Sequence, residues 1–286
     1  MKKNYSFVVA ALVIAALALT ACSPEGEVKA GMEGQTYECL GTAEDALVDL
    51  ECREVNIAVE NAYLPFNYIS AETGEAGGWD YEVFVELCTL LHCKPVFVET
   101  AWEVMIQSVA DGLIDMSGDG VTITEARLEQ VDFTDGYVNV EQRLLVQLGD
   151  DRFADLDEFV ANPDLILGTQ AQTSNYETAI KYLPEERIQA FEQFPFAVQA
   201  LIAGDVDAVL IDETAGLGYM GTNAESVELI GPSISSDQLG FPVTKGSDLL
   251  EPFNLAIQAL KDNGVLQQIN LKYFGPDFTI TYDDIQ

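Results

Sequence analysis

Arg127 is the residue best suited to binding a small anion. The chain holds 13 lysines and arginines against 48 acidic residues, so a basic residue within a motif is conspicuous. A guanidinium group is planar, keeps its charge and offers paired N–H donors that match a carboxylate. Thr124, three residues earlier, is a suitable N-cap, and the N–H groups and dipole of a helix start also favour an anion. We therefore expect Arg127 to bind a carboxylate; the alternative is a surface ion pair with an acidic residue.

Two distant segments, 107–115 and 199–207, share the pattern Q-x-[VL]-x-x-G-x-[IV]-D. Each is typical of a helix end, a glycine that can take a positive φ, and the start of a strand. Asp119 and Asp212 follow the two segments, at the far end of each expected strand. Open α/β sheets bind ligands beyond the carboxyl ends of their strands, so the pattern predicts two similar halves facing one cleft. Chance similarity of two helix–glycine–strand units is the alternative.

The elements that must position these residues alternate between strand-like and helix-like stretches, which indicates a parallel α/β architecture. Helices are recognised by apolar residues at helical spacing, and their ends by glycine or proline. The helix pattern that begins at Trp102 includes Leu113 and is broken at Gly112, and Gly264 breaks the last helical segment. The expected strands are 55–59 and 94–98, and the expected helices are 80–91, 102–113 and 249–273.

The N-terminus has the pattern of an export signal. Lys2 and Lys3 precede an apolar run at 7–19, which is shorter than the roughly 20 residues that cross a bilayer. Small residues before Cys22 resemble the lipobox of bacterial lipoproteins. We expect 1–21 to be a lipoprotein signal peptide and Cys22 to be lipidated, which places the mature chain outside the cytoplasm, anchored at the cell surface or in the periplasm. An ordinary signal peptide with an accidental cysteine is the alternative.

The mature chain is expected to be strongly acidic. Loss of the signal with its two lysines leaves 11 basic against 48 acidic residues, a net charge of −37. Such a field repels nucleic acid and anionic lipid headgroups, which excludes both as partners. Residues 22–35 are rich in Gly, Glu, Ser and Pro and are expected to be a flexible tether. The remainder is long enough for one large domain or two lobes.

The four cysteines after Cys22 indicate disulfide bonds, because their number is even and the chain is expected to be exported. Three pairings are possible, of which the two local pairs, Cys39–Cys52 and Cys88–Cys93, are favoured. Zinc binding is the alternative. The cysteines lack the usual CxxC spacing, and the single histidine follows a helix-like segment directly before Cys93. We therefore expect no metal site.

Several motifs in order and at consistent spacing resemble one known family. They are Ala62-Tyr-Leu-Pro-Phe66, Gly78-Trp-Asp-Tyr81, Thr122-Ile-Thr-Glu-Ala-Arg127 with Val131-Asp-Phe-Thr134, Val206-Asp-Ala-Val-Leu-Ile-Asp212, and the closing Leu266-Gln-Gln-Ile-Asn-Leu-Lys-Tyr-Phe-Gly275. Together they resemble the amino-acid-binding receptors of ATP-driven importers, the family-3 extracellular solute-binding proteins. The resemblance covers about residues 54–275.

This resemblance implies an α/β, two-lobed periplasmic-binding-protein-like fold of type II, with two crossing hinge strands. The hinges would lie near 144–147 and 238–240. Residues 36–53 fall outside the usual family boundaries, and we expect this N-terminal extension to be a disulfide-clipped cap on the first lobe. The expected division is lobe 1 at 54–143 and 240–286, and lobe 2 at 144–239.

The resemblance also implies residues that bind an amino acid through its charged groups. Thr122 and the backbone N–H groups around Gly120 would join Arg127 at the carboxylate. Ser174 would donate from the second lobe, although Gln170-Ala-Gln-Thr-Ser174 has Gln172 where the family usually has glycine. We include Gln170 in the expected site. Asp212 matches the aspartate that binds the ammonium group; its alternative role is a cap for the helix that follows.

Four further residues are expected to surround the ligand's side chain. Tyr63 and Trp102 match positions where the family places covering walls, the alternative being simple core packing. Glu60 stands at the end of the first strand, where relatives that bind polar or basic side chains carry an acid, and Asp119 would add negative charge. If both acids face the cleft, a cationic or amide side chain is favoured over an acidic one.

The function implied is that of a receptor, not an enzyme. It would bind an amino acid by hinge closure as a monomer without a cofactor, and deliver it to the permease subunits of an ABC transporter. A cyclohexadienyl-dehydratase-like enzyme on the same fold is the alternative, with Glu60 or Asp119 as general acid. Against it stand the lipobox and the lack of a recognisable nucleophile–base pair. A sensor domain is a second alternative, disfavoured because the chain ends shortly after the last family helix.

Overall fold

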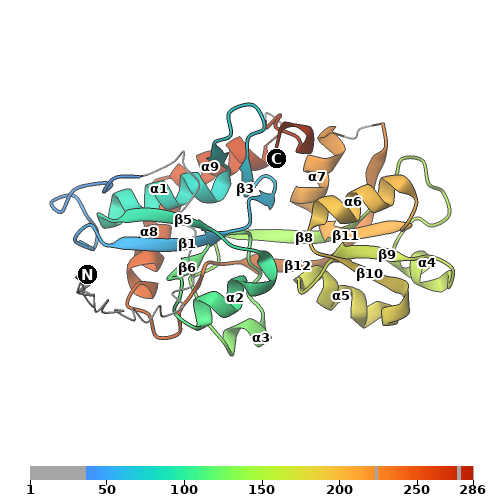
Figure 1. Ribbon diagram of the computed structural model, residues 1–286, viewed down its shortest axis with the longest axis horizontal. Helices are drawn as coiled ribbons and strands as arrows, with labels where there is room; N and C mark the ends of the chain where they lie inside the picture. Colours follow the sequence, from blue (N-terminus) through green and yellow to red (C-terminus); the bar gives the residue numbers. More distant parts are fainter. Residues whose placement is uncertain (1–36, 223–224, 276–277, 286) are drawn as a thin grey trace, which may run out of the picture.

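The computed structural model describes residues 37–222, 225–275 and 278–285. Within them the chain forms two α/β lobes that lie next to each other along the long axis of the molecule (Figure 1). The expected signal peptide at 1–21, the expected lipidation site Cys22 and the expected tether at 22–35 lie outside the described residues. Among the helices of the described ranges, none is long and apolar enough to cross a membrane.

Lobe 1 is built on a five-stranded sheet with the order β5-β1-β6-β13-β7. β1 is parallel to β5 and β6, and β13 returns antiparallel to β6 and β7. Along β1, Val55 and Ile57 face the core that includes α1, α8 and α9, whereas Ala58 packs in the cluster that contains α2. The strands are β1 Glu54–Val59, β5 Lys94–Glu99, β6 Met116–Ser117, β7 Asp132–Phe133 and β13 Pro242–Val243; the helices are α1 Trp79–Leu91, α2 Trp102–Ala110, α3 Glu125–Leu128, α8 Leu250–Asp262 and α9 Val265–Phe274.

Lobe 2 has a second five-stranded sheet, in the order β10-β9-β11-β8-β12. Leu144, Leu167 and Leu210 from three of its strands pack with Phe159 of α4 and Ala179 of α5 in a separate core. The strands are β8 Val138–Gln147, β9 Leu167–Gln170, β10 Ile188–Phe191, β11 Ala208–Asp212 and β12 Val227–Leu239; the helices are α4 Leu156–Ala161, α5 Ser174–Tyr182, α6 Phe194–Ala203, α7 Glu213–Thr222 and the short 3-10 helix Glu185–Arg187.

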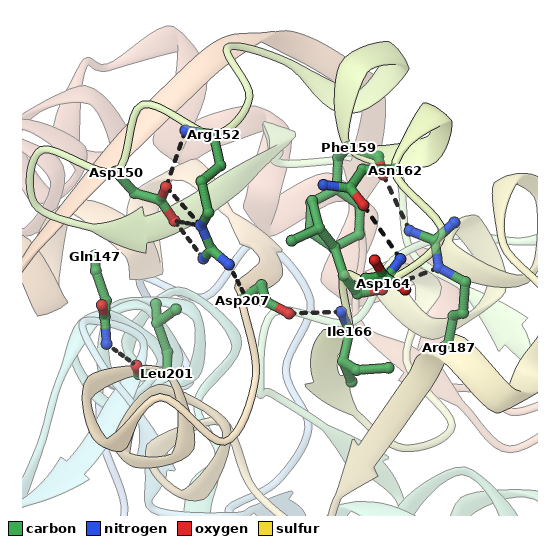
Figure 2. Close-up of polar contacts among 11 residues, drawn as sticks. Gln147, Asp150, Arg152, Phe159, Asn162, Asp164, Ile166, Arg187, Leu201 and Asp207 are labelled. Atoms are coloured by element: carbon green, nitrogen blue, oxygen red, sulfur yellow. Dashed lines mark hydrogen bonds and ion pairs between the residues drawn. The ribbon is translucent and has the colours of Figure 1, made fainter.

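The two segments with a shared sequence pattern build the same structure in the two lobes. In lobe 1 the carboxylate of Asp115 accepts the backbone N–H of Asn56 at 2.8 Å, at the start of the first parallel strand. In lobe 2 the carboxylate of Asp207 accepts the backbone N–H of Ile166 at 2.8 Å, and Arg152 holds its other oxygen (Figure 2). Each aspartate thereby joins two neighbouring strands of its sheet, which confirms that the halves are alike.

Two long antiparallel strands, β8 and β12, connect the lobes. Their pairing begins with Val138 opposite Leu239 and continues into the lobe 2 sheet. Arg143 already pairs with Ile211 of β11 in lobe 2. The first crossing therefore precedes Arg143 and lies earlier than the boundary that the family resemblance implied, because the strand pairing of Arg143 already belongs to the lobe 2 sheet. The second crossing, at Leu239, lies within the expected segment 238–240.

The end of the chain makes contacts that the sequence pattern did not predict. After β1 a small antiparallel sheet forms from β2 Ala62–Tyr63, β3 Asn67–Ile69 and β4 Ala76–Gly77. The final segment pairs beside it, since Ala71 N–H donates to the carbonyl of Asp284 at 2.8 Å. A short 3-10 helix, Tyr282–Asp284, lies there next to α7 of lobe 2. The C-terminal segment therefore touches both lobes.

Most expected elements are present, with one helix shorter than expected. α2 ends at Ala110, and Leu113 is 73% exposed instead of being part of an apolar helix face. Gly112 takes a φ of 69°, a left-handed conformation that stops the helix before Leu113. The expected break at Gly264 is confirmed, because this residue has a φ of 80° between α8 and α9.

Both expected disulfides are present, Cys39–Cys52 and Cys88–Cys93. The second links the end of α1 to the residue before β5. Cys39 and Cys52 are joined to each other, so their sulfurs are not free to bind zinc together with His92, which lies beside them. The extension runs over the end of α1, where the N–H groups of Leu40, Leu47 and Leu50 donate to carbonyls of Cys93, Leu90 and Leu91.

Candidate ligand-binding site

A cavity lies between the two lobes and is lined by residues of both. Its walls come from the carboxyl ends of strands in both sheets and from the starts of α2, α3, α5 and α6. All ten residues expected from the sequence line this one cavity: Glu60, Tyr63, Trp102, Asp119, Gly120, Thr122, Arg127, Gln170, Ser174 and Asp212. Three lining residues were not expected, namely Thr173, Asn175 and Phe194.

Arg127 is held in place by contacts from both lobes. Thr124 caps α3 by accepting the N–H of Arg127 at 3.3 Å, as expected. The guanidinium donates to the carbonyl of Thr122 at 2.8 Å and to that of Gln172 at 3.4 Å, and stacks over the ring of Trp102 at 5.2 Å. It is 6% exposed, and burial lowers its pKa. No ion pair within the described ranges involves Arg127, and its remaining N–H donors can bind a carboxylate.

Hydroxyl groups from the two lobes meet beside Arg127. The Oγ1 atom of Thr122 lies 3.0 Å from the Oγ atom of Ser174, the first residue of α5. Thr173 caps this helix by accepting the N–H of Tyr176 at 3.1 Å, so the positive end of α5 is directed toward the cavity. Gln172 takes a φ of 59°, the left-handed conformation that favours glycine, which accounts for the glycine usual there.

Asp212 is the acidic residue that lobe 2 contributes to the cavity. It ends β11 and is 3% exposed. One carboxylate oxygen accepts a hydrogen bond from the hydroxyl of Tyr63 in lobe 1, and the other accepts Nδ2 of Asn175 at 3.2 Å. Burial raises the pKa of Asp212, and these two hydrogen bonds oppose that rise. The lobes are thus joined at the position where an ammonium group is expected.

Two further acids, Glu60 and Asp119, lie together on the lobe 1 wall. The backbone N–H of Glu60 donates to the Asp119 carboxylate at 3.4 Å, and Asn67 donates to the same oxygen at 2.5 Å. Gln170 of lobe 2 donates to the Glu60 carboxylate at 3.3 Å. Burial, together with the charge of Asp119, raises the pKa of Glu60 to about 8, and burial raises the pKa of Asp119 to about 6. Neither acid forms an ion pair among the described residues.

Asn175 is the most informative of the residues that the sequence analysis missed. It is 2% exposed, its Nδ2 is committed to Asp212, and its Oδ1 has no hydrogen-bond partner among the described residues. A buried acceptor without a partner costs free energy unless a ligand supplies a donor. Its position directly after Ser174, an expected site residue, was the sequence feature that could have indicated it. Phe194 begins α6, and its ring packs at 5.9 Å from that of Tyr63 to close the opposite wall.

Residues 55–276 match the bacterial extracellular solute-binding proteins, family 3. The chain belongs to this family. The two-lobed fold expected from the sequence is confirmed, because the similar solved structures are amino-acid-binding proteins of this kind. Members of the family are extracytoplasmic binding proteins, and the similar curated proteins are named as binding proteins rather than enzymes.

Individual relatives differ in the amino acid that they are named for. The L-arginine-binding protein of Pseudomonas aeruginosa is 30% identical over 239 residues, covering 79% of this chain and 89% of that protein. The L-cystine-binding protein TcyJ of Escherichia coli is 26% identical over 225 residues, covering 78% and 83%. An ancestral arginine-binding protein bound to arginine has 29% identity and a TM-score of 0.73, covering 78% and 98%. The ancestral amino acid-binding protein AncCDT-1, a precursor of cyclohexadienyl dehydratase, has 27% identity and a TM-score of 0.71, covering 79% and 96%.

Proposed function

We propose that this protein is a receptor that closes its two lobes around one amino acid with a cationic side chain. It then delivers this ligand to the permease of an ABC transporter. The observation that carries the proposal is the charge of the cavity wall. Arg127 is the single cation among the described lining residues, whereas Glu60, Asp119 and Asp212 are acids.

The main-chain groups of an amino acid use one charge of each sign. Its carboxylate binds Arg127, Thr122 and Ser174, which lie together on one side of the cavity. Its ammonium donates to Asp212 and to the Oδ1 atom of Asn175, which has no hydrogen-bond partner among the described residues. Glu60 and Asp119 are then left without a countercharge, and a guanidinium or ammonium on the ligand's side chain would supply it. An acidic side chain would instead add a buried negative charge beside two acids.

Closure follows from contacts that join the lobes around this cavity. Tyr63 reaches Asp212, Thr122 meets Ser174, and Gln170 reaches Glu60. A ligand that binds groups on both lobes stabilises the closed form by its differential contact energy, while β8 and β12 act as the hinge. With Cys22 lipidated and 22–35 as a tether, the receptor would stay at the membrane next to its permease.

The dehydratase-like alternative has one observation in its favour. Glu60 lines the cavity with a pKa of about 8, so it carries a proton at neutral pH and could act as a general acid. The binding names of the curated relatives favour the receptor. Purified protein that converts prephenate or arogenate, with the activity lost in Glu60→Gln, would decide for the enzyme.

Thermal unfolding with a panel of amino acids tests the proposal. Arginine, lysine, histidine, glutamine, cystine and glutamate are compared, and a ligand at 100 times its Kd should stabilise the protein by about 2.7 kcal/mol. We expect arginine or lysine to give the largest shift and glutamate none, with Arg127→Ala abolishing every shift. A larger shift with glutamate would contradict the cationic specificity. No shift with any amino acid would contradict the receptor itself.

A further inference from the structure

The two disulfides lie in opposite environments. Cys88 and Cys93 are fully buried in the lobe 1 core. Cys52 is exposed and Cys39 is half-buried, in the N-terminal extension at the outer end of lobe 1, away from lobe 2 (Figure 1). A reagent in solution can therefore reach the Cys39–Cys52 bond, whereas the buried pair provides a control within the same chain.

A histidine and an aspartate lie in line with the exposed sulfur. Nε2 of His92 is 3.7 Å from Sγ of Cys52, and Nδ1 of the same ring is 2.7 Å from Oδ1 of Asp49. The Asp49 carboxylate accepts the N–H of Nδ1 and fixes the orientation of the ring, so that Nε2 faces the sulfur. The order carboxylate, imidazole, sulfur is the arrangement that stabilises a thiolate in reactive cysteine sites.

The backbone holds these three side chains together. His92 caps α1 in a left-handed conformation with a φ of 49°, and its carbonyl accepts the N–H of Cys52 at 2.9 Å. The N–H of Leu50 donates to the carbonyl of Leu91 at 3.0 Å, and Asp49 also accepts the N–H of Glu51 at 2.8 Å. The turn that carries Asp49 and Cys52 is thereby fixed against the helix end.

The cationic side chains near this turn form ion pairs with other residues. Arg53 pairs with Asp115 and Asp248, and Lys94 pairs with Glu54. Among the described residues, His92 is the one whose side-chain nitrogen lies within 4 Å of this disulfide as a hydrogen-bonding partner. In a chain with a large excess of acids, a thiolate at Cys52 would be disfavoured without it.

We propose that Cys39–Cys52 is a thiol–disulfide exchange site that accepts electrons from a dithiol, with His92 and Asp49 stabilising Cys52 as the leaving thiolate. A thiolate of the dithiol attacks Sγ of Cys39, the S–S bond breaks, and its electron pair goes to Sγ of Cys52, next to Nε2 of His92. The second thiol then attacks the dithiol's own sulfur in the mixed disulfide and releases Cys39. Overall the dithiol becomes a disulfide, and two electrons and two protons pass to Cys39 and Cys52.

Opening this bond would change the extension and not the ligand cavity. The disulfide closes a loop between residues 13 apart, and the loop lies over the end of α1. Reduction would leave the segment from Cys39 to Cys52 held by its backbone hydrogen bonds, the contact of Asp49 with His92 and the packing of its leucines on the core. The exchange site is therefore independent of the proposed receptor function.

Graded reduction of the full chain tests the proposal. The oxidised protein is treated with dithiothreitol, quenched with acid, alkylated and analysed by mass spectrometry of its peptides. We expect Cys39–Cys52 to open faster than Cys88–Cys93. The variant His92→Asn should slow that opening about tenfold and leave the buried pair unchanged, because a poorer leaving group lowers the exchange rate. Asparagine tolerates the left-handed cap, so the turn is kept.

The direction of attack gives a second readout. With glutathione as the probe, trapped mixed disulfides should lie on Cys39, with Cys52 released. Asp49→Asn should give a smaller decrease in rate than His92→Asn, because Asp49 acts on the sulfur only through the imidazole ring of His92. Equal opening rates for the wild type and His92→Asn would overturn the proposal, because exposure alone would then explain the reactivity. Glutathione trapped mainly on Cys52 would overturn it as well.

Discussion

Arg127 lies in a buried environment, unlike an arginine that forms an ion pair on the surface. It is buried, stacked on Trp102 and bonded to carbonyl groups of both lobes, while carrying no carboxylate partner among the described residues. A buried cation without a countercharge is costly, and a ligand carboxylate removes that cost. The ionised forms of Glu60 and Asp119 likewise lack a countercharge, which agrees with their raised pKa values. The site is therefore incomplete in charge without its ligand.

Substitution of Arg127 should abolish binding more than it destabilises the fold. Two charge-assisted hydrogen bonds contribute about 1.5–3 kcal/mol each, so Arg127→Ala should raise the Kd at least about 100-fold. Arg127→Lys keeps the charge but loses the paired donors, so its Kd should lie between those of the wild type and Arg127→Ala. Isothermal titration measures both variants. Lys181→Ala, an exposed lysine on α5, is the control for loss of one positive charge. An unchanged Kd in Arg127→Ala would refute the carboxylate role.

Asn175 should contribute to binding although no sequence motif marked it. Its free oxygen is expected to accept the ligand's ammonium, so Asn175→Ala should weaken binding about tenfold. The variant loses the hydrogen bond to Asp212 but also removes a buried acceptor without a partner among the described residues; the two effects oppose each other, so the melting temperature should change little. Titration calorimetry and thermal unfolding of the same preparation test both parts. Unchanged affinity together with a lower melting temperature would indicate a purely structural residue.

The elements were predictable where their signals are local. Apolar spacing located α1, and glycine at position 264 separated α8 from α9. Leu113 was placed in a helix because its spacing fits one, but the left-handed Gly112 ends α2 earlier. Motif resemblance brought ten distant residues into one cavity. Phe194 was missed because its contact with Tyr63 depends on how the lobes close, which no local pattern encodes.

The C-terminal segment should stabilise the closed form. The ring of Tyr282 stacks on that of Tyr219 in α7, with centroids 3.5 Å apart, while its neighbour Asp284 is bonded to Ala71 of lobe 1. Aromatic pairs contribute about 0.5–1.5 kcal/mol, so Tyr282→Ala should speed ligand dissociation about two- to tenfold. Tyr282→Phe keeps the ring but loses the hydroxyl, which bonds to Tyr219, so its dissociation rate should lie between those of the wild type and Tyr282→Ala. Stopped-flow fluorescence of Trp102 in the cavity measures the rate, and equal rates in all three proteins would contradict a role in closure.

At the scale of the whole molecule, two α/β lobes share one acid-rich cavity that neither could form alone. Each lobe places an aspartate at the cleft beside the end of a strand: Asp119 lies two residues after β6, and Asp212 is the last residue of β11. Behind the lobe 1 wall lies Asp80, fully buried and bonded to Asn67, which also holds Asp119. Burial raises the pKa of Asp80 to about 8. The stability of the entire protein is therefore coupled to the protonation of this cluster.

The ligand-free protein should lose stability as the pH rises from about 5 to about 8. Glu60, Asp80 and Asp119 have folded-state pKa values of about 8, 8 and 6, above those of unfolded acids. The native state thus binds more protons than the unfolded state in this range, and its free energy of unfolding falls as they dissociate. A cationic ligand lowers the pKa of Glu60 and Asp119, so saturating arginine should flatten this fall, and arginine affinity should rise toward pH 8.

Thermal unfolding across this pH range, with and without arginine, measures the coupling. Glu60→Gln removes one titrating group, so its melting temperature should fall less with rising pH in the absence of ligand. Titration calorimetry in two buffers of different ionisation enthalpy should detect protons released on binding near pH 7. The release follows because arginine would bind the ionised acids better than the protonated ones. A melting temperature that rises between pH 5 and 8, or proton uptake on binding, would contradict a cation held between Glu60 and Asp119.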